Sequence, residues 1–386
     1  MTKCPLCFHT LTPDRISWMS TSGEATADRI ATRYAGFPVS SRTIVEAHSK
    51  KRGAPVPSRD AAMTMVGSEV QEVCPDCHHP LPERWRDHDT VCIAMAGARA
   101  TGKTIYIAVL VRALQMAGER LGRVVEPHDQ RTAESYEQFY ETILYKERRM
   151  LSGTISLAGR TAADTDHGTL VLRLGHSGGR QQLLVIRDVA GEDLQNRANA
   201  SEQWTRFFGH ADGVVFMFDP LKVPSVENQL RGLIPQAAPD TSPPLTVLQT
   251  VLSMIGSNNP RLAVVLSKFD ALHELRNVRG SEWSTVMSNP GAGFSRDPSA
   301  NRTGYDENDG ELVDAEVRSL LTMLRAKPII DAVDSPHTGA RLNSRFFAVS
   351  ALGALPAGQR VYEGGISPFR CLDPVRWILD GAGVWN

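Results

Sequence analysis

The stretch Gly97–Thr104 constrains the fold of this chain more than any other part of the sequence. It follows the apolar run Val91–Ala96 and precedes the helix-forming run Ile105–Leu114. The glycines let the backbone curl so that N–H groups point at phosphate oxygens, and the helix N-terminus adds the positive end of a dipole. In this pattern Lys103 reaches the β- and γ-phosphates, and the Thr104 hydroxyl can ligate Mg²⁺. We expect a nucleotide phosphate site formed by Gly97, Ala100, Thr101, Gly102, Lys103 and Thr104.

Length and composition bound the remaining possibilities. With 386 residues the chain exceeds one ordinary domain, so two units are expected. A net charge of −1 gives no global basic excess that would support binding to nucleic acid, although a local patch stays open. The N-terminus has no apolar signal core, no apolar run is long enough to span a membrane, and the C-terminus carries no prenylation cysteine. We therefore expect a cytoplasmic protein without a membrane anchor.

Four of the six cysteines form two matching pairs. The segments Cys-Pro-Leu-Cys-Phe-His and Cys-Pro-Asp-Cys-His-His both follow the pattern C-P-x-C, in which two thiolates sit on a tight turn. Four thiolates complete a closed tetrahedral site, so the metal is expected to be structural zinc. The ligands are expected to be Cys4, Cys7, Cys74 and Cys77.

Other pairings are less economical. A disulfide is improbable in the cytoplasm. His9, His78 and His79 are spare candidate ligands that we expect at the surface, whereas Cys92 and Cys371 are expected to be buried small apolar residues.

The two cysteine pairs are separated by an unusually long insert, residues 8–73. It is rich in Ser, Thr, Ala and Arg and includes the basic stretch 49–57. Its composition favours a solvated loop, with a small separate element as the alternative.

From residue 90 onward, apolar runs alternate with helical patterns, which is typical of an α/β fold with a mainly parallel sheet. Residues 175–179 indicate a hairpin turn, and residues 221–244 and 281–310 read as irregular insertions. The expected strands are Val91–Ala96, Thr169–Leu174, Gln182–Arg187, Gly213–Phe218, Leu262–Leu266 and Arg345–Val349. The expected helices are Ile105–Arg120, Thr132–Leu151, Gln203–Phe208, Thr246–Ile255, Leu312–Ala326 and Pro374–Leu379.

Three further motifs follow strands. Asp188-Val189-Ala190-Gly191 has the D-x-x-G form, in which Asp188 would hold Mg²⁺ and the Gly191 amide would meet the γ-phosphate. Ser267-Lys268-Phe269-Asp270 resembles the [N/T]-K-x-D motif, whose carboxylate accepts hydrogen bonds that guanine offers and adenine does not. The segment Ser350-Ala351 matches the short element whose backbone contacts guanine O6.

Four motifs in this order make residues 88–386 resemble a P-loop GTPase of the translation-factor and Ras-like (TRAFAC) class. Together with the cysteine pairs, the residues Asp188–Glu192 and Ser267–Asp270 resemble those of the bacterial double-GTPase group. The resemblance implies a Ras-like domain at residues 88–386, preceded by a zinc-ribbon module at residues 1–87. It also implies GTP or GDP and Mg²⁺ as cofactors and a partner that is a protein effector or second GTPase in a bacterial conflict or stress system.

Hydrolysis is less well defined by the sequence. Glu192 stands where Ras-like enzymes commonly carry a Gln that orients water, so it either orients water or caps the next segment. Arg99 in the phosphate loop either stabilises transition-state charge or points to solvent. Thr161, or alternatively Thr165, is expected to ligate Mg²⁺ from a loop, and Asp219 either lies near the nucleotide or simply begins a loop.

The favoured hypothesis is a Mg²⁺-dependent GTP switch that hydrolyses slowly alone, with Lys103, Glu192 and Arg99 as catalytic candidates. A partner would recognise residues 152–168 and 190–202. The alternatives are a P-loop ATPase, with Asp188 or Asp219 as its acidic residue, and a non-hydrolysing scaffold whose zinc ribbon docks a partner.

Overall fold

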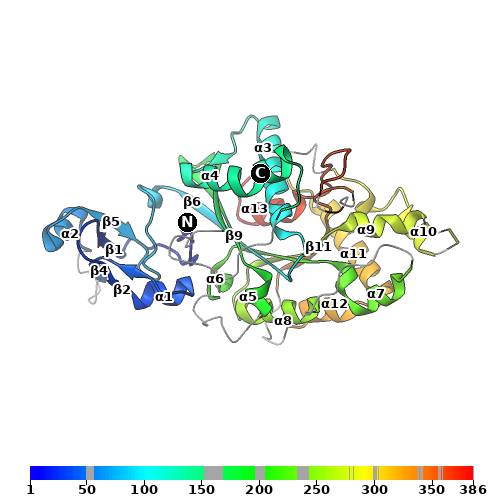
Figure 1. Cartoon of the computed structure of the whole chain (residues 1–386), viewed down its shortest axis with the longest axis horizontal. Coiled ribbons are helices and arrows are strands. Elements are labelled where there is room, and N and C mark those ends of the chain that lie inside the picture. Colours follow the sequence, from blue (N-terminus) through cyan, green and yellow to red (C-terminus); the bar gives the residue numbers. More distant parts are fainter. Residues whose placement is uncertain are drawn as a thin grey trace.

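A seven-stranded sheet forms the centre of the molecule (Figure 1). Its strands are β6 (Asp89–Gly97), β7 (Glu126–Pro127), β8 (Thr169–Ser177), β9 (Arg180–Asp188), β10 (Gly213–Phe218), β11 (Arg261–Leu266) and β12 (Ser344–Ala348). Their order across the sheet is β12-β11-β10-β6-β9-β8-β7. The neighbours from β12 to β9 run parallel, whereas β8 pairs antiparallel with β9 and with β7. The predicted class, a mixed and mainly parallel sheet of the Ras-like type, is confirmed.

The computed structural model describes residues 1–48, 56–151, 168–195, 205–232 and 243–277, and most residues from 279 to 385. Within that last part it leaves out residues 281, 299–301, 303, 337–338, 340–341, 355–357 and 359. All statements about structure below concern the described residues.

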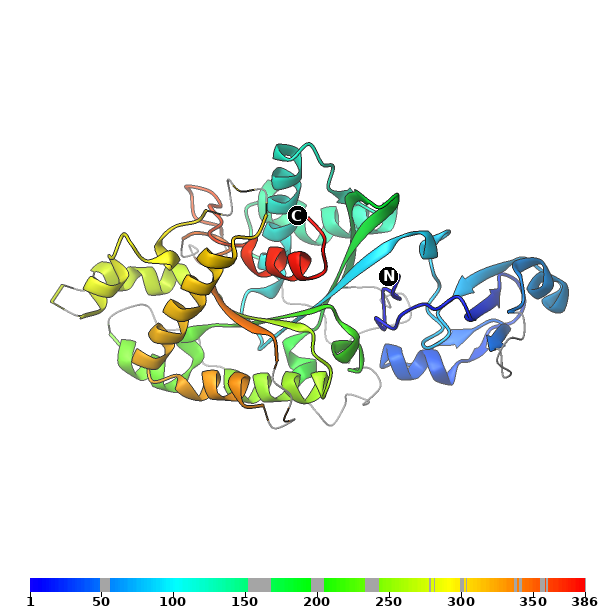
Figure 2. The same ribbon diagram turned by 180° about the vertical axis from the view of Figure 1, so that it is seen from behind.

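Helices cover both faces of the sheet, because its central strands are apolar on both sides. In β6, Cys92, Ala94 and Ala96 face one apolar core, and Ile93 and Met95 face the other. The second core is closed by α3 (Lys103–Arg120), α4 (Gln130–Tyr136) and α13 (Asp373–Gly381). The first core is covered by α5 (Gly191–Gln195), α6 (Phe207–His210), α7 (Pro224–Leu230), α8 (Pro244–Ile255), α11 (Glu307–Met323) and α12 (Lys327–Asp334). Figures 1 and 2 show the two layers from opposite sides.

Several predicted boundaries were wrong. The helix expected over Thr132–Leu151 is α4 followed by a π-helical segment, η2 (Glu137–Lys146), and ends before Leu151. The described part of the helix expected at Gln203–Phe208 is the short α6. The insertions read as irregular contain η5 (Pro220–Lys222), α7, α10 (Glu282–Met287), η7 (Gly293–Ser295) and the first turn of α11.

The insert between the cysteine pairs is folded over most of its length, so the loop interpretation was wrong there. Its three-stranded sheet has the order β4-β1-β5, and a two-stranded sheet and two helices accompany it. These elements are β1 (Arg15–Ser20), β2 (Thr26–Ala27), α1 (Arg29–Ala35), β3 (Ser40–Ser41), β4 (Ile44–His48), α2 (Arg59–Val66) and β5 (Val70–Val73). They lie at one end of the molecule, in blue in Figure 1, and we call them the insert module.

The helix-capping signals of the insert module were present in the sequence. Asp28 accepts N–H groups at the start of α1, and Gly36 ends that helix with a left-handed backbone. Ser58 and Gly67 do the same for α2. The basic stretch 49–57 lies mostly outside the described residues.

Candidate nucleotide site and metal centre

The phosphate loop leaves β6 and enters α3 with the backbone curl that its motif predicts. Ala100 and Gly102 both have left-handed backbones, with φ of 60° and 87°. A Cβ on Gly97 would collide with the carbonyl oxygen of Met217 on β10, so only glycine fits at this position. Two left-handed residues before a helix N-terminus turn successive N–H groups toward one point.

Lys103 is buried inside this loop. Its Nζ donates to the carbonyl oxygens of Gly97 at 2.9 Å and Ala98 at 3.2 Å. Burial lowers the pKa of Lys103, and the nearby Asp188 carboxylate acts in the opposite direction. The loop therefore holds a cation that faces an acidic residue at the end of β9.

The D-x-x-G segment packs directly on the phosphate loop, because β9 and β6 are parallel neighbours. A Cβ on Gly191 would lie 2.5 Å from the backbone nitrogen of Arg99. Only glycine allows this approach. Asp188 is buried. The strand pairing and the close approach of Gly191 bring both residues to the loop that contains Lys103 and Thr104.

Arg99 and Glu192 form an ion pair across this junction. Arg99 Nη1 lies 3.1 Å from Glu192 Oε1, and the two side chains are 70% and 42% exposed. Neither alternative for these residues anticipated that they would be partners. In this conformation each neutralises the other beside the phosphate loop.

The two base-recognition segments meet at the carboxyl ends of β11 and β12. Ser350 Oγ donates to Asp270 Oδ1 at 2.6 Å and accepts the Gly353 N–H at 2.9 Å. The Phe269 N–H donates to the Val349 carbonyl, which fixes the two loops side by side. Asp270 and Ala351 are partly exposed at this edge.

The remaining polar residues of this edge are bonded to β10. Ser267 Oγ donates to the Phe218 carbonyl at 2.9 Å, so the hydroxyl anchors the loop to the sheet. Lys268 Nζ lies 2.9 Å from Asp219 Oδ2, and Asp219 also accepts the Leu221 N–H. Asp219 is 1% exposed and therefore belongs to the support of the Lys268 loop as well as to the start of η5.

The two candidate switch threonines, Thr161 and Thr165, lie outside the described residues, as do most of 152–168 and part of 190–202.

The four paired cysteines form one buried cluster. Their sulfur atoms all lie within 4.8 Å of one another, with Cys4 3.6 Å from Cys77 and Cys7 3.6 Å from Cys74. Zinc–sulfur bonds of about 2.3 Å in a tetrahedron require sulfur separations of about 3.8 Å. The chemistry and spacing of these donors fit zinc, and burial raises the pKa of the Cys7 and Cys77 thiols, which a bound cation would counteract.

The histidines beside the cluster are not simply surface residues. His78 is buried and its Nδ1 lies 2.8 Å from Asp28 Oδ2, which corrects the surface expectation for this residue. The His9 ring packs on His210 with 3.8 Å between the centroids. Cys92 and Cys371 are buried as expected.

Comparison with known proteins decides the family. The family model described as Double-GTPase 2 matches residues 91–320, which is more than half of the chain. The chain belongs to the Double-GTPase 2 family. This membership implies a domain that binds guanine nucleotides, and the matched region includes three of the four motifs, ending before Ser350-Ala351.

A named relative extends over the whole of this double-GTPase chain. It is the "Putative ESX-1 scaffolding and assembly protein SaeC" of Mycolicibacterium smegmatis, 44% identical over 388 residues and covering 100% of both chains. The match therefore includes the cysteine pairs and the insert module.

Two solved structures also show similarity to this family member. A bacterial selenocysteine-specific elongation factor matches 76% of this chain and 29% of its own, with 14% identity and a TM-score of 0.28. The Arl6 small GTPase of Trypanosoma brucei matches 77% and 99%, with 11% identity and a TM-score of 0.31. Both TM-scores are low, so the assignment rests on the family model and the relative.

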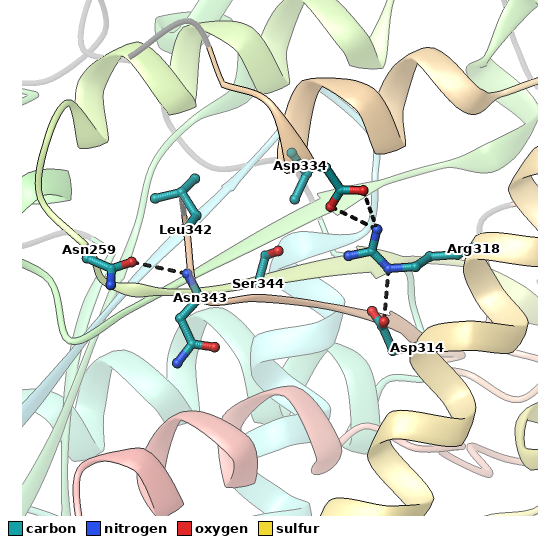
Figure 3. Close-up of a pocket in the computed structure, with 8 residues that line it drawn as sticks. Asn259, Asp314, Arg318, Asp334, Leu342, Asn343 and Ser344 are labelled. Carbon is teal, nitrogen blue, oxygen red and sulfur yellow. Dashed lines mark hydrogen bonds and ion pairs between the residues drawn. The ribbon is translucent and has the colours of Figure 1, made fainter. Parts of the chain in front are cut away.

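A polar hollow of about 750 Å³ lies at the opposite end of the sheet from the motifs of the double-GTPase domain (Figure 3). Asn259 and Ser344 border it at the starts of β11 and β12. Arg318 is bound there by Asp314 and Asp334. Its charges are already paired within the protein, and it is separate from the nucleotide site.

Sequence reasoning missed residues that connect the metal centre with the double-GTPase domain. Arg187 stands in β9 directly before Asp188, and Phe207 begins α6. A charged residue inside an apolar strand was the available signal for Arg187.

No described helix combines the length and apolarity needed to cross a membrane.

Proposed function

We propose that this chain is a Mg²⁺-dependent GTP switch with slow intrinsic hydrolysis, and that it controls the assembly of a protein complex. The observation that carries the proposal is the hydrogen bond between Asp270 and Ser350, which aligns two base-recognition segments at one edge of the sheet. An adenine nucleotide site does not require this arrangement.

Each residue of the proposed site has a defined task. The curled loop from Ala100 to Thr104 and the Lys103 ammonium would bind the β- and γ-phosphates, and Asp270 would accept hydrogen bonds from the guanine edge. Thr104 and Asp188 would hold Mg²⁺, which when bound neutralises charge on the phosphate oxygens. Gly191 would present its N–H to the γ-phosphate.

The ion pair between Arg99 and Glu192 supports slow turnover. An arginine accelerates phosphoryl transfer only when its charge reaches the phosphate oxygens. Here the Arg99 charge is directed to Glu192. We infer that the chain hydrolyses GTP slowly until a partner separates the pair.

The proposed partner is a protein. The relative carries a scaffolding and assembly name, and its match covers this whole chain. A conflict-system effector or a second GTPase would equally be a protein partner. The free cysteines of the metal centre fit the cytoplasmic location that the sequence predicts.

The test is the nucleotide and metal content of the purified chain, followed by base exchange. We expect guanine nucleotide and one zinc per chain. Asp270→Asn should shift the preference toward xanthine nucleotides. Asp270 lies in helix α9 (Phe269–His273), and Glu274→Gln directly after that helix should not shift it. Bound adenine nucleotide, or no base shift, would overturn the guanine assignment.

A second candidate, a scaffold that binds GTP without hydrolysing it, is favoured by the same ion pair. Single-turnover phosphate release separates the two functions. Release that rises in Glu192→Ala, which frees Arg99, supports the switch. No release in any variant or with any partner supports the scaffold.

A further inference from the structure

Arg187, the residue before the candidate Mg²⁺ ligand Asp188, contacts the first turn of the four-cysteine cluster. Arg187 is 5% exposed although it is charged. Its guanidinium donates to the carbonyl oxygen of Leu6 and lies 4.0 Å over the ring of Phe207. A buried charge is costly unless it is bonded, so these contacts hold the end of β9 in place.

The backbone of Leu6 links that guanidinium to a cysteine sulfur atom. Leu6 lies between Cys4 and Cys7, and its N–H points at Cys4 Sγ at 3.4 Å. Its carbonyl accepts from Arg187. Zinc with four thiolates would have a net charge of about −2, so a buried cation one residue away would stabilise the loaded centre.

The same cysteine turn also contacts the chain that follows the D-x-x-G segment. Phe8 and Phe207 pack edge to face, with 5.4 Å between ring centroids, and both are fully buried. Phe207 therefore has the Arg187 guanidinium on its face and the Phe8 ring against it. Residues 4–8 thus contact Arg187 through the Leu6 carbonyl and Phe207 through the Phe8 ring.

These contacts flank the residues expected at the γ-phosphate. Arg187 adjoins Asp188, and Gly191 is packed on the phosphate loop at the Arg99 backbone. A displacement of β9 at Arg187 would move Asp188 directly, because the two are consecutive residues of one strand.

We propose that the first cysteine turn, residues 4–8, positions Asp188 and Gly191 through Arg187, so that metal occupancy and nucleotide binding are coupled. Arg187 is a positioning residue in this scheme. The inference rests on the proposed nucleotide site. Coupling between two binding sites is reciprocal, so nucleotide must strengthen metal retention by the same factor by which metal strengthens nucleotide binding.

Arg180 provides a matched control at the other end of β9. It donates to the carbonyl oxygens of Arg86 at 2.8 Å and His88 at 2.7 Å, and so holds the same N-terminal region to the sheet. Seven residues of strand, about 23 Å, separate it from Arg187. A general loosening of the N-terminal region affects both arginines, whereas positioning of Asp188 depends on Arg187.

The experiment uses the full chain loaded with zinc. Zinc transfer to a colorimetric chelator is measured without nucleotide, with GDP and with a non-hydrolysable GTP analogue, and the affinity for a fluorescent GDP is measured before and after zinc removal. We expect bound nucleotide to raise the apparent equilibrium affinity of the chain for zinc, measured against the chelator, by about fivefold or more. This is the lower range of allosteric couplings. Zinc removal should weaken fluorescent GDP binding by the same factor.

Arg187→Gln should abolish this coupling, and Arg180→Gln should keep it. If Arg187→Gln does not fold, Phe207→Leu, which retains an apolar side chain but loses the ring, is measured instead and should also lose the coupling. Tight guanine binding without any coupling in the wild-type chain would overturn the inference and leave the proposed function standing. Absence of guanine binding in the zinc-loaded chain would overturn both.

Discussion

The two cysteine turns have the same backbone and different neighbours. Phe8 and His78 hold equivalent positions with φ of 60° and 57°, and each donates its N–H to the carbonyl of the first cysteine of its turn. Cys4 and Cys74 each donate to a histidine carbonyl five positions later, at 2.9 Å in both turns. The repeat in sequence is thus a repeat in structure.

The residue after the second cysteine of each turn determines what the turn packs against. Phe8 inserts into the core of the double-GTPase domain against Phe207. His78 instead bonds to Asp28, which begins helix α1 of the insert module. One turn therefore faces the large domain and the other the insert, with the four cysteine sulfur atoms between them.

Loss of the metal should disrupt the packing of both cysteine turns, and it should have the largest effect on stability. Structural zinc contributes about 10–16 kcal/mol of apparent binding free energy, as much as the whole stability of an ordinary domain. Cys74→Ser should abolish zinc binding, measured by metal analysis, and expose the N-terminal region to proteolysis. Cys371→Ala, outside the cluster, should keep its zinc, and full zinc content in Cys74→Ser would contradict the four-thiolate site.

Truncating the equivalent side chains should separate the two turns. Phe8→Ala leaves a cavity in the core and should lower the free energy of unfolding by about 3–5 kcal/mol. His78→Ala removes a buried hydrogen bond to Asp28 and should lower it by about 1–3 kcal/mol. Urea unfolding of both variants checks the order, and a larger loss for His78→Ala would show that the turn facing the insert matters more.

Mild acid should lower the free energy of unfolding through His210, which lies beside the first turn, and this effect should be the smallest of the three. Burial, and then the neighbouring His9, lowers the pKa of His210 to about 4. Folded His210 therefore stays neutral where the unfolded residue, with its ordinary pKa of about 6.5, takes up a proton. The contribution of neutral His210 to the free energy of unfolding is fully present above pH about 6.5 and is lost as the pH drops toward 4.

The measurement is the urea midpoint at pH 7 and pH 5.5 with zinc retained. The wild-type midpoint should fall more than that of His210→Gln, which has no titratable group at this position. An equal fall of the urea midpoint in the two proteins would exclude His210 as the cause of the acid sensitivity.

The parts of the fold that the sequence predicted are those whose information is local. Gly97 and Gly102 mark required backbone conformations, and the buried parallel strands read as continuous apolar runs. The insert sheet escaped prediction because its strands are short and half-solvated, with only Ser17 and Ser20 buried in β1. A buried serine gives no apolar periodicity.

The contacts between distant segments could not be predicted from the sequence. Arg187 and Leu6 are 181 positions apart, and nothing in either segment specifies the other. The Asp270–Ser350 contact was within reach, because two motifs with one ligand must converge. The Arg99–Glu192 pair could not be predicted, since the alternatives for Arg99 were transition-state charge or solvent and those for Glu192 were water or a helix cap.

The spacing of the cysteine turns has a consequence for how the chain is made. Cys7 and Cys74 are 67 positions apart, so the ribosome releases the first two thiols well before the second two. Two thiols alone make an incomplete and weakly binding site. A four-thiolate site would therefore be complete only after β5 has joined β1 and brought the later pair back to the start of the chain, and Arg187 emerges later still.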